Sequence, residues 1–292
     1  MKPAPFSYVR PESLTGALRF LAEHPDEAKP LAGGQSLLPV LNLRLSRIAY
    51  LVDITRIPGL AEIESTGDGG LALGGLVRHR ELAASPLVRD RAPLLAQAAS
   101  LIGHNAIRNR GTLGGSVAHA DPAAELPAAL VALEATVLIA GADGERECPA
   151  GSFFLGLMTT ALAPGQLITG VRVPPPVPRS GWAYLECARR HGDFAMVGVA
   201  AGIALDQGGS CAAARLVFSG VGDLPHRAQA AEALLKGRVL TSDLLAEAAR
   251  AAVQPMDPPS DLHASGSYRR EVAQVYATRA LQSALDQALA SL

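Results

Sequence analysis

The chain has 292 residues, with 26 basic and 27 acidic side chains and a formal net charge of −1. This length favours two domains over a single small core. The balanced charge gives no basic surface of the kind that nucleic acids require, so we expect no nucleic-acid partner. No run of about 18 uncharged apolar residues occurs, and the N-terminus lacks a signal-peptide pattern, so we expect a cytoplasmic protein without a transmembrane segment.

The cysteines and histidines are scattered along the chain. Cys148, Cys187 and Cys211 form no CxxC pair, and the seven histidines show neither HxH nor HxxxH spacing. The sequence therefore predicts no disulfide framework, no iron–sulfur cluster and no metal site built from this chain alone. Unpaired cysteines also suit a reducing compartment.

The first third of the chain is expected to form a small βαβ-like unit. Apolar residues recur at helical spacing over 14–23, and Ser13 precedes them as a candidate N-cap. A turn containing two glycines follows. An apolar helical stretch is then predicted over 37–45, and a short buried strand over 51–54.

The middle of the chain is expected to alternate hairpins and helices. A hairpin is predicted over 63–76, and a helix over 93–102. Another helix is expected to begin at about Pro122, where Asp121 is a candidate cap and proline suits the first turn. A second hairpin is predicted where the strand over 135–140 meets a glycine-containing turn.

A proline-rich stretch, Pro174–Pro178, is the clearest linker in the sequence. Such a run favours an extended path and cannot lie inside a helix. We therefore place the domain boundary there, with a first domain over 1–176 and a second over 177–292. The first domain divides into subdomains of about 1–57 and 58–176.

The second domain is expected to be α+β, with strands first and helices afterwards. Strands are predicted over 194–205 and 213–218, on either side of a glycine turn. Helices are predicted to follow over 228–235, 243–252 and 268–289.

Two short segments share a pair of adjacent glycines and hydroxyl side chains: Ala32, Gly33, Gly34, Gln35 and Ser36 in the first, and Thr112, Leu113, Gly114, Gly115 and Ser116 in the second. A pyrophosphate needs several backbone N–H donors that converge on it, and paired glycines allow the main chain to approach closely. One such turn is more often a routine bend, but two of them favour a nucleotide site. Neither segment is a Walker loop or a GxGxxG fingerprint, which disfavours P-loop and Rossmann folds.

Two further clusters admit two interpretations each. Asp121 and Glu125 follow the second glycine segment, where they either cap a helix N-terminus or accept hydrogen bonds from ribose hydroxyls. Asp193 and Phe194 end a charged turn that begins at Arg189. This turn is either a solvated surface turn or one that places Asp193 and Phe194 against a cofactor ring or a partner chain.

No catalytic set of nucleophile, base and orienting residue occurs in the sequence. There is no GxSxG motif, no HExxH motif and no convincing pair of catalytic acids. We therefore assign no catalytic residue to this chain. If the chain is part of an enzyme, the chemistry belongs to a cofactor.

The segments 32–39, 108–116 and 121–127 resemble the paired FAD signatures of the medium subunit of aerobic carbon monoxide dehydrogenase and of related hydroxylases of the xanthine dehydrogenase family. The segments 189–195 and 262–270 are also similar to that family. The resemblance covers essentially the whole chain, in the right order. The doubled glycine motif with its trailing acid is its specific part.

The resemblance implies that the whole chain is of the α+β class. It implies a PCMH-like FAD-binding domain of two α+β subdomains, followed by a smaller α+β domain of antiparallel strands and helices. It implies FAD as the cofactor, with its pyrophosphate held by Ala32–Ser36 and Thr112–Ser116. Glu125 would lie near the adenosine ribose, and Phe194, next to Asp193, beside the flavin ring. No metal ligand and no catalytic residue is implied in this chain.

The resemblance also implies two partners, a large subunit with the molybdenum cofactor and a small iron–sulfur subunit, assembled as a dimer of heterotrimers. The chain would relay electrons from the iron–sulfur clusters through the flavin to an external acceptor. Substrate chemistry would take place on the large subunit. The alternatives left open are a self-contained flavin oxidase and a nucleotide-binding structural subunit without a redox role.

The sequence departs from the family pattern at four positions. Gln35 stands where carbon monoxide dehydrogenases have histidine, and Ser116 replaces a frequent asparagine. Leu185 replaces a lysine, and Phe194 replaces a tyrosine, of some relatives. These departures weaken a specific assignment to carbon monoxide oxidation. They leave FAD binding intact, because FAD binding depends mainly on backbone donors.

Overall fold

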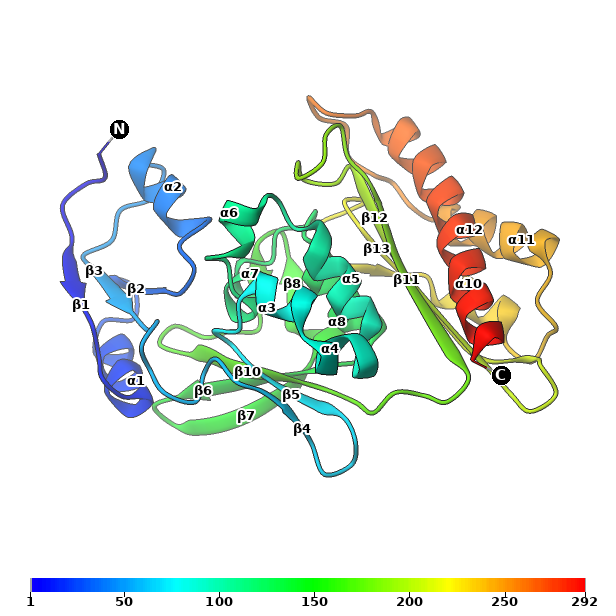
Figure 1. Cartoon of the computed structure of the whole chain (residues 1–292). Coiled ribbons are helices and arrows are strands. Elements are labelled where there is room, and N and C mark those ends of the chain that lie inside the picture. Colours follow the sequence, from blue (N-terminus) through cyan, green and yellow to red (C-terminus); the bar gives the residue numbers. More distant parts are fainter. Residues whose placement is uncertain (1, 292) are drawn as a thin grey trace.

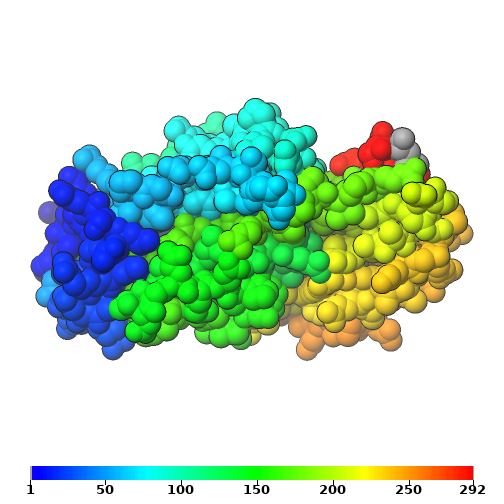
Figure 2. All heavy atoms as spheres, turned by 90° about the horizontal axis from the view of Figure 1, so that it is seen from below, coloured from blue at the N-terminus to red at the C-terminus, as the bar shows by residue number. Residues whose placement is uncertain are grey.

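The computed structural model describes residues 2–291, which form three units in a row (Figure 1). The units are built on a parallel three-stranded sheet, an antiparallel five-stranded sheet and an antiparallel four-stranded sheet, in chain order. Figure 2 shows the same succession, from the N-terminal segment at one end to the C-terminal third at the other. The mixture of sheets and helices confirms the α+β expectation.

The N-terminal unit consists of β1 (Ser7–Val9), α1 (Leu14–Glu23), β2 (Ala28–Leu31), α2 (Leu37–Asn42) and β3 (Tyr50–Asp53). Strand β3 lies between β1 and β2 and pairs in parallel with both. The predicted cap of α1 is confirmed, because the Ser13 hydroxyl accepts a hydrogen bond of 3.1 Å from the Gly16 amide. Helix α2 ends earlier than predicted, since Arg44 adopts a φ of 56°, which a right-handed helix cannot contain.

The middle unit contains the five-stranded sheet, the helices on it and a small two-stranded hairpin. Its strands are β4 (Ile63–Ser65), β5 (Leu71–Gly74), β6 (Thr136–Gly141), β7 (Gly144–Pro149), β8 (Phe154–Gly156), β9 (Thr159–Thr160) and β10 (Leu167–Val173). Its helices are α3 (His79–Ala84), α4 (Pro86–Arg91), α5 (Pro93–Leu101), α6 (Asn105–Arg108), α7 (Leu113–His119), α8 (Glu125–Ala132) and α9 (Ala150–Phe153). Both predicted hairpins are confirmed, as β4–β5 and β6–β7.

The C-terminal unit is a four-stranded sheet backed by helices. It comprises β11 (Ser180–Cys187), β12 (Val197–Leu205), β13 (Cys211–Ser219), β14 (His226–Arg227), α10 (Gln229–Leu235), α11 (Ser242–Val253) and α12 (Gly266–Ala290). Every residue of β12 is buried. The reason is that α12 packs on one side of this strand while α8 of the middle unit contacts β12 and β13. An apolar run without alternation is typical of a strand covered on both faces.

Helix α8 is the central element of the molecule. All eight of its residues are buried, including Glu125. It contacts α5 and α7 of its own unit as well as β12 and β13. The two units therefore share one apolar contact region around α8.

The start of α8 differs from the sequence prediction. The helix was expected to begin at about Pro122 with Asp121 as its cap, but it begins at Glu125 with Ala124 at the N-cap position. The Asp121 carboxylate instead accepts a hydrogen bond of 2.9 Å from the Ala123 amide, which closes a local turn. The prediction was wrong because an aspartate side chain can accept a hydrogen bond from the amide two residues further on, and this bond stabilises a turn as readily as a helix cap.

Within residues 2–291, no helix has both the length and the apolar character that a membrane crossing would need.

Candidate cofactor site

The first glycine segment leaves the parallel sheet at the carboxyl end of β2, the edge at which open α/β sheets commonly bind ligands. Gly34 has a φ of 73°, which explains a glycine there. The side-chain amide of Gln35 donates to the Gly33 carbonyl at 3.2 Å. The amides of Gly33, Gly34, Gln35 and Ser36 donate to no other residue of the part that the structure describes. These free N–H groups form a nest suited to an anion.

The second glycine segment has a different conformation from the one predicted. Gly114 and Gly115 lie in the first turn of α7, not in a bend, and both have negative φ. Thr112 is the N-cap, and its hydroxyl accepts a hydrogen bond of 3.1 Å from the Gly115 amide. The glycines serve close approach instead. A Cβ on Gly114 would lie 2.8 Å from the Gly75 carbonyl oxygen.

The amides of the second segment are mostly engaged within the protein, which corrects the expectation that they converge on a ligand. Leu113 donates to the Val77 carbonyl at 2.9 Å, and Gly114 donates to the Gly75 carbonyl at 2.8 Å. From Thr112 to Ser116, only the Thr112 amide lacks a hydrogen-bond acceptor among residues 2–291. The Ser116 side chain is half-buried and has no hydrogen bond within the same residues. This segment therefore offers fewer donors than the first.

The structure brings the first glycine segment against the backbone of Arg110 and Gly111, which leads directly into the second segment. A Cβ placed on Gly33 would lie 2.5 Å from the Arg110 carbonyl oxygen and 2.7 Å from the Gly111 Cα. A Cβ on Gly115 would lie 4.0 Å from the Ala32 Cβ. Two segments far apart in sequence thus lie side by side. The free amides of the first segment lie beside the N-terminus of α7, whose dipole favours negative charge.

The predicted ribose ligand, Glu125, lies in a buried polar cluster between the middle and C-terminal units. Its side chain is 5% exposed, and this burial raises its pKa to about 8, with further contributions from Glu186 and Asp121. Burial also raises the pKa of Glu186 to about 7, and its Oε2 atom is buried without a partner among residues 2–291. The nearby Tyr184 hydroxyl lies 3.3 Å from the Ser219 hydroxyl. A protonated Glu125 can donate a hydrogen bond as well as accept one.

The charged turn before β12 lies against the loop that leads into the second glycine segment. Gly192 has a φ of 88°, and a Cβ there would lie 2.5 Å from the His104 ring. His104 immediately precedes α6, which in turn leads to Gly111. Asp193 and Phe194 are both exposed on this turn, and 65% of the Phe194 surface is open to solvent. An aromatic ring so exposed is available to a ligand or a partner.

Arg78 and His79 are residues of this region that the sequence analysis missed. Arg78 is the N-cap of α3, and His79 is its first residue. The Arg78 guanidinium donates to the Arg110 carbonyl, and the His79 ring is hydrogen-bonded to the Thr112 carbonyl. The sequence His79-Arg80-Glu81-Leu82 is indistinguishable from an ordinary exposed helix start, so only the tertiary structure reveals these contacts.

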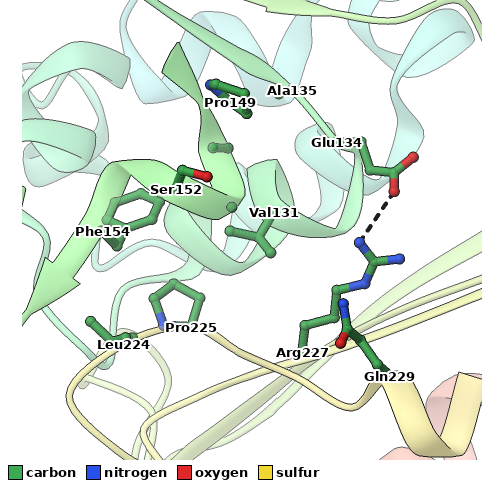
Figure 3. Close-up of a pocket in the computed structure, with 12 residues that line it drawn as sticks. Val131, Glu134, Ala135, Pro149, Ser152, Phe154, Leu224, Pro225, Arg227 and Gln229 are labelled. Atoms are coloured by element: carbon green, nitrogen blue, oxygen red, sulfur yellow. Dashed lines mark hydrogen bonds and ion pairs between the residues drawn. The ribbon is translucent and has the colours of Figure 1, made fainter. Parts of the chain in front are cut away.

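A separate hollow of about 410 Å³ lies at the carboxyl end of α8 (Figure 3). It is bounded by Phe154 and Pro149 of the middle unit and by the segment 224–229 of the C-terminal unit. Arg227 reaches across to Glu134 at 3.2 Å. None of the predicted site residues lines this hollow, so it is distinct from the candidate cofactor site. Among residues 2–291, no three His, Cys, Asp or Glu side chains lie together as a metal site would need.

Two family models match this chain. Residues 4–176 match the FAD binding domain in molybdopterin dehydrogenase, and residues 182–284 match the CO dehydrogenase flavoprotein C-terminal domain. Together they cover nearly the whole chain.

Relatives and solved structures agree with this assignment. The chain is 46% identical to subunit alpha of the 6-hydroxypseudooxynicotine dehydrogenase complex of Paenarthrobacter nicotinovorans, over 99% of this chain and 97% of that protein. It is 36% identical to the carbon monoxide dehydrogenase medium chain of Hydrogenophaga pseudoflava, over 97% of this chain and 98% of that one. A chain in the structure of quinoline 2-oxidoreductase from Pseudomonas putida 86 superimposes with a TM-score of 0.94 at 39% identity, over 99% of this chain and all of that chain. The protein therefore belongs to the family of FAD-binding medium subunits of molybdenum hydroxylases of the carbon monoxide and xanthine dehydrogenase type.

Proposed function

We propose that this chain binds the pyrophosphate of FAD between its two glycine segments and relays electrons from a partner's iron–sulfur clusters to an external acceptor. The observation that carries the binding site is the row of free amides from Gly33 to Ser36, set against the backbone of Arg110 and Gly111. Such a row satisfies a diphosphate without any basic side chain. The free amides suit an anion that approaches the backbone closely, such as the pyrophosphate of FAD.

In this proposal, residues of both segments have distinct roles. Ala32 to Ser36 supply backbone donors, and the Ser36 hydroxyl is exposed beside them. Thr112 to Ser116 supply the N-terminus of α7 and the free Thr112 amide. Leu113 and Gly114 orient that helix through their hydrogen bonds to the Val77 and Gly75 carbonyls.

We also propose Glu125 for the adenosine ribose and Asp193 with Phe194 for the flavin ring. Glu125 is buried, so its contact with a ribose hydroxyl would be shielded from water. Phe194 offers an apolar ring without a hydroxyl, so it packs against a flavin without donating a hydrogen bond. Bound FAD supplies the redox chemistry, because it exchanges electrons both singly and in pairs. The chain holds it, excludes water from part of it and orients it toward the partner.

The proposed partners are a large molybdenum-cofactor subunit and a small iron–sulfur subunit, in a dimer of heterotrimers. The support is that the relatives are named as one subunit of a complex or as a medium chain. The proposed domain division, 1–176 and 177–292 with subdomains of about 1–57 and 58–176, follows the matched family models and the three sheets.

The binding proposal is tested by the visible spectrum of the purified chain, with chromatography of the cofactor released on denaturation. Flavin absorbance and a product that co-elutes with FAD are expected. A colourless protein that takes up no added FAD, either alone or co-expressed with its partner subunits, would refute it.

The relay is tested separately with the partner. The small subunit is reduced chemically, freed of reductant and mixed with the FAD-loaded chain in the absence of oxygen. Bleaching of the flavin absorbance, together with reoxidation of the clusters, is expected. If the clusters deliver electrons to the acceptor equally fast with and without FAD on this chain, the relay is wrong even though FAD is bound.

A further inference from the structure

The segment Gly75–His79 is hydrogen-bonded to the backbone of residues 110–114, which includes the start of the second glycine segment. The Leu113 and Gly114 amides donate to carbonyls of this segment, as described above. In the opposite direction, the His79 amide donates to the Gly111 carbonyl at 3.1 Å, and the Arg78 guanidinium donates to the Arg110 carbonyl. The His79 ring completes the set, with its Nε2 2.9 Å from the Thr112 carbonyl oxygen.

The direction of the His79 hydrogen bond is fixed by chemistry. A carbonyl oxygen only accepts, so Nε2 carries the proton and donates. The ring is 6% exposed, and its burial, together with the charges of Arg78 and Arg108, lowers its pKa to about 4. The ring is therefore neutral at pH 7, and its Nδ1 has no proton. Nδ1 is buried and has no hydrogen-bond partner within residues 2–291.

The His79 ring packs so closely against Gly111 that a side chain at position 111 would collide with it. A Cβ on Gly111 would lie 2.7 Å from both Cε1 and Nδ1 of His79. Only a glycine at position 111 therefore allows the ring to lie this close to the backbone. Leaving a buried nitrogen without a hydrogen bond destabilises the fold, a cost that an apolar side chain of similar size would not incur. A histidine at this position therefore sacrifices stability for the bond that its Nε2 makes.

The hydrogen bond from His79 Nε2 is made to Thr112, the first residue of the second glycine segment. Thr112 is the N-cap of α7, and it directly follows Arg110 and Gly111, whose backbone lies against Gly33. Its carbonyl also accepts the Ser116 amide at 3.0 Å. Fixing this carbonyl fixes the peptide plane between Thr112 and Leu113.

We propose that His79 is a positioning residue for FAD binding, which holds the Thr112 carbonyl through Nε2 and thereby keeps the backbone of residues 110–112 against the first glycine segment, whose free amides would bind the pyrophosphate. This inference rests on the proposed function, because it presumes that FAD lies at the two glycine segments. In this proposal the imidazole holds the Thr112 carbonyl and does not itself contact the cofactor. No charge is added to the site by the ring.

The test compares His79→Leu with His79→Gln in the full-length chain. Leucine fills the space without a donor, whereas the glutamine side-chain amide can still donate to the Thr112 carbonyl. The affinity for FAD is measured by quenching of flavin fluorescence on titration of the apo chain, and the melting temperature of each apo chain is measured in parallel. We expect FAD to bind about tenfold more weakly to the leucine variant, and glutamine to recover most of that loss.

A purely structural role would give a different pattern. In that case both variants would melt at a changed temperature, and the folded fraction of each would bind FAD as tightly as the wild type, which would overturn the inference. If His79→Leu does not fold, Gly111→Ala takes its place, because the new methyl group would displace the ring while leaving it in the chain. FAD affinity unchanged by Gly111→Ala would equally overturn the inference.

The outcome is separable from the proposed function. A wild-type chain that binds no FAD, or one whose FAD affinity is unaffected by a methyl group on Gly33, refutes the proposed site itself. A wild-type chain that binds FAD and is weakened by Gly33→Ala, but not by His79→Leu, refutes only the role of His79.

Discussion

The contact between the two glycine segments allows a sharp prediction for Gly33→Ala. The new Cβ would lie 2.5 Å from the Arg110 carbonyl oxygen and 2.7 Å from the Gly111 Cα. Non-bonded carbon atoms normally approach to about 3.5 Å, so the two backbones must separate by roughly 0.8 Å. Both sides of the contact are main chain, and no side-chain rotation can relieve it.

The expected cost is about 1–3 kcal/mol, the range for one methyl group forced into a packed site. The apo chain can relieve the clash by letting the segments move apart, whereas FAD binding at the proposed site requires them together. The cost should therefore appear mainly in binding. We expect Gly33→Ala to bind FAD roughly 5- to 150-fold more weakly, with a small change in the melting temperature of the apo chain.

The assay is the flavin fluorescence titration, with Gly67→Ala as the matched control. Gly67 lies in the β4–β5 turn with a negative φ, and a Cβ there would meet no atom within 4 Å. The same substitution at this position should leave both FAD affinity and melting temperature near wild type. If Gly33→Ala binds FAD as tightly as Gly67→Ala, the pyrophosphate does not lie between the two segments.

Two further predictions concern the contact region between the middle and C-terminal units. The folded-state pKa of Glu125 is raised from 4.5 to about 8, so the folded chain retains a proton that the unfolded chain loses. This group should therefore lower stability by up to about 4–5 kcal/mol as pH rises from about 5 to 9. In urea unfolding, Glu125→Gln should show a shallower pH dependence and keep only the part that the raised pKa of Glu186 contributes below about pH 7. An identical slope in both proteins would contradict the burial argument. Glu134 pairs with Arg215 at 2.8 Å and with Arg227 at 3.2 Å, which lowers its pKa, and it is about half exposed. Glu134→Gln should therefore lower the free energy of unfolding by only about 1 kcal/mol at neutral pH, and this loss should shrink in high salt and as pH falls below about 4.5. A loss of stability that does not depend on salt would refute the ionic origin.

The sequence by itself determined those features that depend on neighbouring residues. Helix α1 and its Ser13 cap were predictable because helical periodicity and capping are local. The hairpin formed by β6 and β7 was predictable for the same reason, since alternation and a glycine turn suffice. The two glycine segments could be identified as candidates because close backbone approach requires that residue type. Their resemblance to one family supplied the cofactor.

The tertiary structure decided what each glycine does. Gly34 takes a left-handed conformation, whereas Gly114 and Gly115 lie in a helix and make room for Gly75 and for the Thr112 hydroxyl. A pair of adjacent glycines gives the same sequence pattern in a turn and in a helix, because the pattern does not specify which backbone segment will pack against it. The prediction of a second turn was therefore wrong although the segment itself was well chosen.

The tertiary structure also decided which distant residues meet. Gly33 touches Arg110 and Gly111, and His79 lies beneath Gly111, only because the parallel sheet and the helices of the middle unit fold against each other. The burial that raises the pKa of Glu125 comes from helices of its own unit together with strands more than 50 residues further along the chain. Contacts of this kind leave no local pattern in the sequence, since each depends on the packing of elements that are specified independently.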